Sequence, residues 1–241
     1  MLFRSNEVRS QKKSLVILCV RDSGYDEATR DFLAMERQVG FRNESIHNYL
    51  NLIEKLVENN YVVLRMGRHC KEDLRLDGFY DYCRDFEAND LADFFFFLNA
   101  EFCISTGFGL EEIGVFLRKR TYLINVAPLG CLKGGPIYPY SLPRKHVDLI
   151  TGQTLGMNEI LERGMDQAYT MQALQAINGG YESNEINLIT QFTENLIRLE
   201  RDYVNQSQNL VGKNNEIYIS KLWPNFDSSY KNLRSSNYVF I

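Results

Sequence analysis

The feature that most constrains this chain is a short, uninterrupted apolar run near its start, SLVILCV at residues 14–20. The run is rich in β-branched side chains, and the charged residues Lys13 and Arg21 bound it. A strand that is apolar on both faces is typical of a parallel sheet covered by helices on both sides. We therefore expect residues 14–20 to form an interior strand of an α/β fold.

Helical and extended patterns alternate after this run. Apolar residues at three- and four-residue steps from Ile46 to Val57 predict a helix, and the run at 61–66 predicts the next strand. A strand, a helix and a strand at this spacing are typical of a right-handed crossover unit.

The alternation then repeats, with a helix over 91–98, a strand at 102–105, a helix from 107 to about 117 and a strand over 121–126. Four consecutive phenylalanines make more than one face of the helix over 91–98 apolar, so we expect that helix to be well buried. The order of elements predicts a Rossmann-like open parallel sheet of the α/β class.

The remainder of the chain differs in pattern. Residues 127–145 hold four of the five prolines, which predicts a long irregular segment. A stripe of apolar residues over 186–203 predicts a long helix that packs back on the sheet. We therefore expect an N-terminal extension at 1–13, a Rossmann-like domain at 14–150 and a helical C-terminal region at 151–241.

Composition narrows the classes of partner. Lys+Arg 27 against Asp+Glu 31 gives a net charge of −4, so no overall positive field favours nucleic acid. No apolar run approaches the roughly 20 residues that span a bilayer, and the first residues contain no apolar signal core. We expect a cytoplasmic protein, at most peripheral at the inner face of the membrane. The five cysteines are scattered and lack zinc-ligand spacing, which predicts free thiols and no metal site.

Polar residues follow the predicted strands, where an open α/β sheet binds its ligand. Arg21 and Asp22 follow the first strand, Arg65 and Gly67 close the second, and Ser105-Thr106-Gly107 opens the helix after the third. Arginine forks, hydroxyl groups and the amides of a helix N-terminus suit a phosphate or diphosphate. The alternative is that each strand-end arginine pairs with a carboxylate such as Asp22 or Asp93, and that Ser-Thr-Gly is only a turn.

The chemistry of such a site has two further aspects. The chain contains no Asp-x-Asp pair to hold a metal against a diphosphate, so arginine and helix N-terminus would meet the charge without a cofactor. An inverting transfer would need a general base, and Asp22 and Glu111 are both candidates.

Five sequence blocks together resemble a family of bacterial glycosyltransferases from surface-polysaccharide loci. The blocks are Arg21-Asp22-x-Gly-Tyr25, Arg42-Asn43-x-Ser-Ile46-x-Asn-Tyr49, Val63-Leu-Arg65-Met66-Gly67, Phe102-x-Ile-Ser105-Thr-Gly107-x-Gly109 and Leu123-Ile-Asn125-Val-Ala-Pro128-Leu129. They cover roughly residues 14–130. The resemblance implies the nucleotide-sugar-binding half of a GT-B transferase, distantly similar to fucosyltransferases.

The resemblance also implies roles for individual residues. Arg21 would contact the donor diphosphate and help the nucleotide to leave. With the base candidate Asp22, it makes up the predicted catalytic pair. The residues that we predict for the donor site are Arg42, Asn43, Arg65, Gly67, Ser105, Thr106, Gly107, Glu111, Asn125 and Pro128. Among these, Arg65 would be a second phosphate contact, and Asn125 with Pro128 would form the wall of the base or sugar pocket.

Two departures from the family pattern define the alternatives. A GT-B enzyme has two such domains, whereas 241 residues with one clear α/β unit leave no room for a normal second half. Cys19 and Val20 also stand where the fucosyltransferase relatives often carry a histidine before the arginine.

The expected partners are a nucleotide sugar, a glycan or lipid-linked acceptor, and a second transferase domain on another chain. The alternative hypotheses for the same architecture are a non-catalytic nucleotide-binding module, the partner half of a split or truncated transferase, and a polysaccharide pyruvyltransferase-like enzyme.

Overall fold

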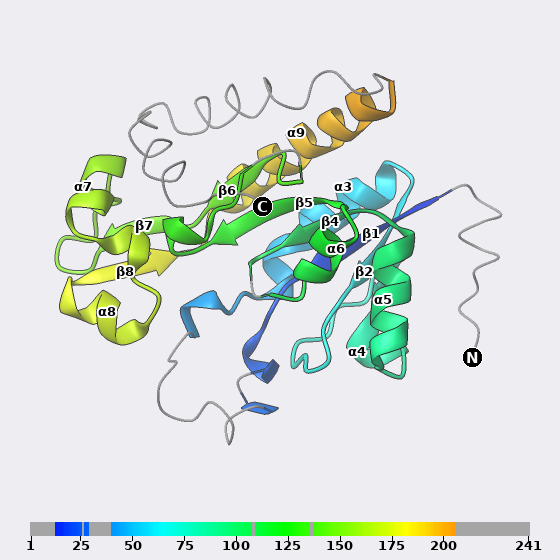
Figure 1. Ribbon diagram of the computed structural model, residues 1–241, viewed down its shortest axis with the longest axis horizontal. Coiled ribbons are helices and arrows are strands. Elements are labelled where there is room, and N and C mark those ends of the chain that lie inside the picture. The colour runs from blue at the N-terminus through cyan, green and yellow to red at the C-terminus, as the bar shows by residue number, and fades with distance from the viewer. Residues whose placement is uncertain (1–12, 26, 29–39, 108, 135–136, 206–241) are drawn as a thin grey trace.

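The protein contains a six-stranded parallel sheet with strand order β3-β2-β1-β4-β5-β6 (Figure 1). The computed structural model describes residues 13–25, 27–28, 40–107, 109–134 and 137–205. The strands are β1 (Ser14–Cys19), β2 (Tyr61–Arg65), β3 (Phe79–Asp81), β4 (Ala100–Ser105), β5 (Arg120–Val126) and β6 (Ser141–Pro143). This order confirms the predicted Rossmann-like α/β fold.

Helices cover both faces of the sheet. One face carries η2 (Ile46–Tyr49), α3 (Leu50–Glu58) and α9 (Ile186–Asn205), and α3 and α9 lie side by side in Figure 1. The opposite face carries α4 (Tyr82–Asp85), α5 (Asp90–Asn99) and α6 (Glu112–Phe116). The first strand is apolar throughout because both of its faces are buried: Leu18 packs toward α3 and α9, and Ile17 packs toward α5.

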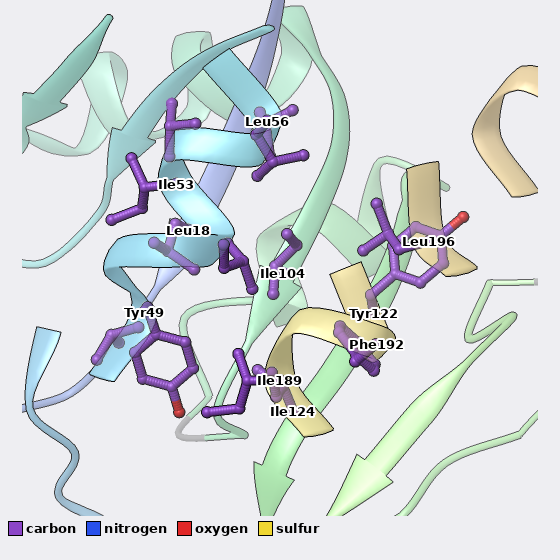
Figure 2. Close-up of a cluster of buried hydrophobic side chains, with 14 of the residues drawn as sticks. Leu18, Tyr49, Ile53, Leu56, Ile104, Tyr122, Ile124, Ile189, Phe192 and Leu196 are labelled. Atoms are coloured by element: carbon purple, nitrogen blue, oxygen red, sulfur yellow. The ribbon is translucent and has the colours of Figure 1, made fainter. Parts of the chain in front are cut away.

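The core between the sheet, α3 and α9 is the largest. Figure 2 shows Leu18 and Ile104 from the sheet meeting Ile53 and Leu56 of α3, with Phe192 and its neighbours of α9 beside them. All five of these side chains are fully buried. The predicted C-terminal helix is therefore an integral layer of the sheet's core and not an appendage.

Local signals fix the ends of these helices. The Ser45 hydroxyl accepts a hydrogen bond from the His47 amide (3.3 Å) at the start of η2, and the Asn89 side chain accepts one from the Ala92 amide (2.9 Å) at the start of α5. Asn60 has a φ of 66°, a left-handed conformation that asparagine adopts readily, and it turns the chain from α3 into β2.

A second, smaller layer follows β6. Strand β7 (Lys145–Asp148) pairs antiparallel with β8 (Gly179–Glu182), so the predicted domain boundary at residue 150 separates two paired strands. Short helices between them share a separate apolar core with β5. They are α7 (Met157–Glu162), η4 (Met165–Gln167) and α8 (Met171–Ala176), and η3 (Leu129–Cys131) and η1 (Gly40–Arg42) are further single turns.

Several predicted elements differ from those observed. The helix expected from residue 107 begins only at Glu112, and β3 and β6 were not predicted. Strand β6 lies within the proline-rich segment, at an edge of the sheet where Pro143 needs no ladder partner on its outer side. Nearly all of the predicted extension at 1–13, and residues 206–241 of the predicted C-terminal region, lie outside the described residues.

The expectation that the helix over 91–98 is well buried is wrong. In α5 only Phe96, Phe97 and Asp93 are buried, whereas Leu91, Phe94, Phe95 and Leu98 are exposed. The sheet accepts one face of the helix, and no other described element covers the opposite face. Among the described residues, no helix is long and apolar enough to cross a membrane.

Candidate functional site

A pocket of about 610 Å³ lies where the chain connections of the sheet change direction. From β1 the chain continues toward β2 and β3, whereas β4 leads to β5 and β6 on the other side. This divergence leaves a crevice at the carboxyl ends of β1 and β4, the usual ligand position in an open α/β sheet. The walls of this pocket come from the end of β1, the loop after β2, the first turns of α5 and the turn before α6. The residues that line it are Val20, Arg21, Tyr25, Gly67, Arg68, His69, Cys70, Asp90, Asp93, Phe94, Gly109, Leu110 and Ile113.

Arg21 and Gly67 are the predicted site residues that line this switch-point pocket. The Arg21 guanidinium lies 4.5 Å from the centre of the Tyr25 ring, a cation–π contact that fixes its direction. The backbone holds it too, since the Glu44 amide donates to the Arg21 carbonyl (2.8 Å). Arg21 is mostly buried, so its charge acts in a setting of low dielectric constant.

Arg68 and His69 provide further cationic or titratable groups that the sequence analysis did not assign to the site. They are the two residues after Gly67 in the loop that follows β2. This position at the end of a strand was the sequence signal that could have assigned them to the site. Arg68 donates to Asp93 (2.6 Å from Nη2) and to Asp90, both at the start of α5. These hydrogen bonds raise the pKa of Arg68 above its ordinary value. The side chain of Arg68 is 44% exposed, so solvent and ligands reach it.

Arg65 lies behind the pocket and is engaged inside the protein. Its guanidinium donates to Asp22 (2.8 Å), to Asp81 (3.2 Å) and to the carbonyl oxygen of Glu72 (2.9 Å), and the side chain is fully buried. This arrangement is the alternative in which a strand-end arginine pairs with a carboxylate. A phosphate would have to displace two buried carboxylates to reach it, so the geometry does not favour the predicted phosphate contact.

The carboxylate of Asp22 is also engaged in hydrogen bonds within the protein. It accepts hydrogen bonds from the amides of Gly24, Lys71 and Glu72 at 2.8, 2.8 and 3.0 Å, in addition to that from Arg65. Burial by itself raises the pKa of Asp22, but the amide and guanidinium donors outweigh it and lower the pKa below its ordinary value. A carboxylate whose pKa is lowered in this way is a weak base, which argues against the predicted catalytic role.

The turn after β4 binds the carboxylate of Glu111, which lies in the same turn. Glu111 accepts from the Ser105 hydroxyl (3.0 Å) and from the Gly109 amide (2.9 Å), while the Gly107 amide donates to Ser105 (3.0 Å). Thr106 donates from its amide to the carbonyl oxygen of Cys19 (3.0 Å). Ser105, which was expected to meet a diphosphate, thus pairs with the expected base Glu111, and the Thr106 and Gly107 amides are also hydrogen-bonded within the protein.

The remaining predicted residues lie around a second group of buried side chains. This far polar cluster consists of Glu44, Asn125, Arg144 and Asn184. Asn125 donates to the Tyr49 hydroxyl (2.9 Å), and its oxygen accepts from the amide of Asn184 (3.0 Å) and from its side chain (2.6 Å).

Arg144 connects the far polar cluster to the segment before η2. It donates to the carbonyl oxygens of Asn125 (3.1 Å) and Asn43 (3.0 Å) and forms an ion pair with Glu44. The Arg42 guanidinium carbon lies 5.8 Å from the centre of the Phe41 ring. Pro128 is buried just beyond β5. All of these residues are described, and none of them lines the switch-point pocket.

Comparisons with protein-family models, with curated proteins and with solved structures find no match. Within the described residues, no group of three or more His, Cys, Asp or Glu side chains is placed to hold a metal ion.

Proposed function

We propose that the switch-point pocket binds a nucleotide-diphosphate sugar and that the protein transfers the sugar to a surface glycan acceptor. The observation that carries this proposal is the position of Arg21, held against Tyr25 at the end of β1 and lining the pocket at the switch point. An arginine there offers a planar fork of donors to a diphosphate. The five sequence blocks of the resemblance support the same assignment.

The chemistry follows from the charges around the pocket. Negative charge builds on the leaving diphosphate during sugar transfer, and Arg21 would stabilise it electrostatically. Arg68 and His69 take the place of Arg65 as further partners for the phosphates, while Tyr25, Phe94 and Leu110 supply apolar surface for the base or sugar. We propose that these cations meet the charge without a metal, in keeping with the lack of an Asp-x-Asp pair in the sequence.

A base for an inverting transfer would have to come from the pocket wall. Asp90 and Asp93 line the pocket, and both accept hydrogen bonds from Arg68. The side chain of Asp90 is 95% exposed and that of Asp93 is 7% exposed, so Asp90 is the more accessible to an acceptor hydroxyl. It replaces Asp22 and Glu111 in the proposal because both of those carboxylates are buried as well as hydrogen-bonded within the protein, whereas Asp90 pairs with Arg68 at the surface.

A non-catalytic nucleotide-binding module is the second candidate. It is favoured by one observation, the engagement of Asp22 and Glu111 in hydrogen bonds within the protein. Such a module would bind a nucleoside diphosphate in the same pocket without turnover.

Thermal unfolding with nucleoside diphosphates and nucleotide sugars, in the absence of metal, tests the proposal. A ligand present at about 100 times its dissociation constant stabilises the folded protein by roughly 2.7 kcal/mol. We expect Arg21→Ala to lose this stabilisation and Arg198→Ala, on the outer surface of α9, to keep it. Equal stabilisation of wild type and Arg21→Ala would remove the pocket from the proposal.

Two further measurements separate the candidate functions. Release of nucleoside diphosphate on addition of a glycan or lipid-linked acceptor indicates a transferase, and binding without release indicates the module. Stabilisation by phosphoenolpyruvate, and by no nucleotide, indicates instead the pyruvyltransferase-like reading.

A further inference from the structure

An apolar stripe runs along the solvent side of α5 and onto α6. Its members are Leu91, Phe94, Phe95 and Leu98 of α5, spaced by three and four residues, together with Phe116 of α6. The rings of Phe94 and Phe116 lie 6.1 Å apart, so the two helices present one continuous surface. Leu91 is 81% exposed and Phe116 is 76% exposed. Isolated apolar residues on a surface are common, but a contiguous stripe indicates a binding surface.

The size of the apolar stripe fits a symmetric interface. With roughly 200 Å² for a complete large apolar side chain, the exposed fractions amount to roughly 600 Å² per chain. Two such surfaces would bury about 1,200 Å², which is the lower end of the range for a specific, stable protein interface. A twofold axis brings the same patch of two identical chains together, so no other partner is needed to cover it.

Charges at the two ends of the stripe set the orientation. Helix α5 runs against the strands, so Asp90 at its start lies at the carboxyl edge of the sheet. Arg118 is exposed and lies just before β5, at the opposite edge, where α5 also ends. Arg68 of the same chain pairs with Asp90 and Asp93, so this end carries two aspartates against one arginine and remains net acidic. The stripe is thus acidic at one end and basic at the other.

We propose that a second copy of this chain packs against the apolar stripe, with the two α5 helices antiparallel. In this arrangement Asp90 of each copy faces Arg118 of the other. A lipid surface suits the stripe less well, because interfacial helices carry lysine and arginine on their polar face whereas α5 carries only aspartates among its charged residues.

The interface adjoins the switch-point pocket. Phe94 lines the pocket and belongs to the stripe, so a second copy along α5 would border the mouth of the pocket. The proposal does not depend on the identity of the pocket's ligand.

Light scattering coupled to size-exclusion chromatography of the full chain tests the proposal. We expect a mass close to twice the 28.1 kDa of one chain. The double variant Phe95→Ser/Leu98→Ser should elute as a folded monomer, since both side chains are exposed and contribute little to the core. The matched control Leu149→Ser/Ile150→Ser changes two exposed apolar residues after β7 and should remain dimeric.

Charge reversal tests the orientation. Arg118→Asp and Asp90→Arg should each weaken the dimer roughly tenfold, since the twofold axis repeats each contact between the copies. The combination of both changes should restore most of the affinity. Circular dichroism and thermal unfolding establish that each variant is folded.

Three results would overturn the proposal. One is a wild-type chain that is monomeric at the highest soluble concentration. The same conclusion holds if that monomer binds neutral lipid vesicles through the stripe. The second is a dimer that survives Phe95→Ser/Leu98→Ser. The third, failure of the double charge reversal to restore what the single changes lose, excludes the antiparallel arrangement.

Discussion

The switch-point pocket and the far polar cluster both lie beyond the carboxyl ends of parallel strands, yet they use their polar groups in opposite ways. In the far cluster, Asn125 and Arg144 direct their hydrogen-bonding groups at other parts of the protein. At the pocket, Arg68 and Asp90 are exposed to solvent at the mouth, and Arg21 lines the wall. Position at a strand end therefore does not distinguish a site from a structural junction.

The difference lies in what each group of residues connects. Asn125 and Arg144 join the end of β5 to the segment before η2 and to the start of α9, which are separated by long stretches of chain. Buried polar groups that perform this task must be fully paired, because an unpaired one costs about 1–3 kcal/mol. The pocket lies where connections diverge, so fewer internal partners are available. Four changes test this contrast, in order of decreasing loss of stability.

Arg65→Ala should cause the largest loss. Removing the guanidinium leaves Asp22 and Asp81 as uncompensated buried charges, at a cost of roughly 3–5 kcal/mol. Urea unfolding monitored by circular dichroism measures the loss, with Arg198→Ala as the control for removal of a surface arginine. A stable Arg65→Ala variant that fails to bind ligand would instead place Arg65 in the pocket.

Acidification should destabilise the region around the far polar cluster through His146, a buried residue whose Nδ1 lies 3.0 Å from the carbonyl oxygen of Arg144. Burial lowers the pKa of His146 to about 4, from about 6.5 in the unfolded chain. The unfolded state therefore binds the proton first as the pH falls, and the folded state loses about 3 kcal/mol between pH 6.5 and pH 4. Urea unfolding across this range measures it. His146→Gln, which does not titrate, should flatten the curve, and an unchanged curve would contradict the assignment.

Asn125→Gly should cost about 2 kcal/mol, because it removes the hydrogen-bond partners of the Tyr49 hydroxyl and of the Asn184 backbone amide. Glycine is chosen because Asn125 has a φ of 52°, which glycine adopts without strain. The ligand-induced rise in melting temperature should remain that of the wild type. Loss of the ligand-induced rise in melting temperature, with unchanged stability, would assign Asn125 to the ligand site instead of the far polar cluster.

Arg68→Ala should have the smallest effect on stability, about 1 kcal/mol, because Arg68 and Asp90 are exposed to solvent and only Asp93 is a buried carboxylate that loses its cation. We expect it to weaken nucleoside diphosphate binding, and Arg68→Lys to recover part of the loss. Isothermal titration calorimetry measures both. Binding equal to wild type in Arg68→Ala would limit the anion contact to Arg21 and His69.

Part of the candidate site could be predicted from the sequence. Arg21 and Gly67 follow strands that are apolar on both faces, so their place at the sheet edge could be predicted. The partners of Arg65 could not, because Asp22 is 43 positions away and Asp81 is 16 positions away, and no local pattern connects them. The same applies to Glu111, whose side chain folds back on its own turn.

The sequence alone was enough to predict β1, β2, β4 and β5 and the helices α3, α5 and α9, because the periodicity of apolar side chains is a local property of each segment. It was also enough to predict that the first strand is interior. Strands β3 and β6 could not be predicted in this way. The assembled fold decided which arginine faces the pocket and which is buried away from it. It also decided which side of α5 is left open to solvent. Those choices depend on contacts between segments far apart in the chain, and the energies of such contacts exist only once the sheet and its helices are assembled.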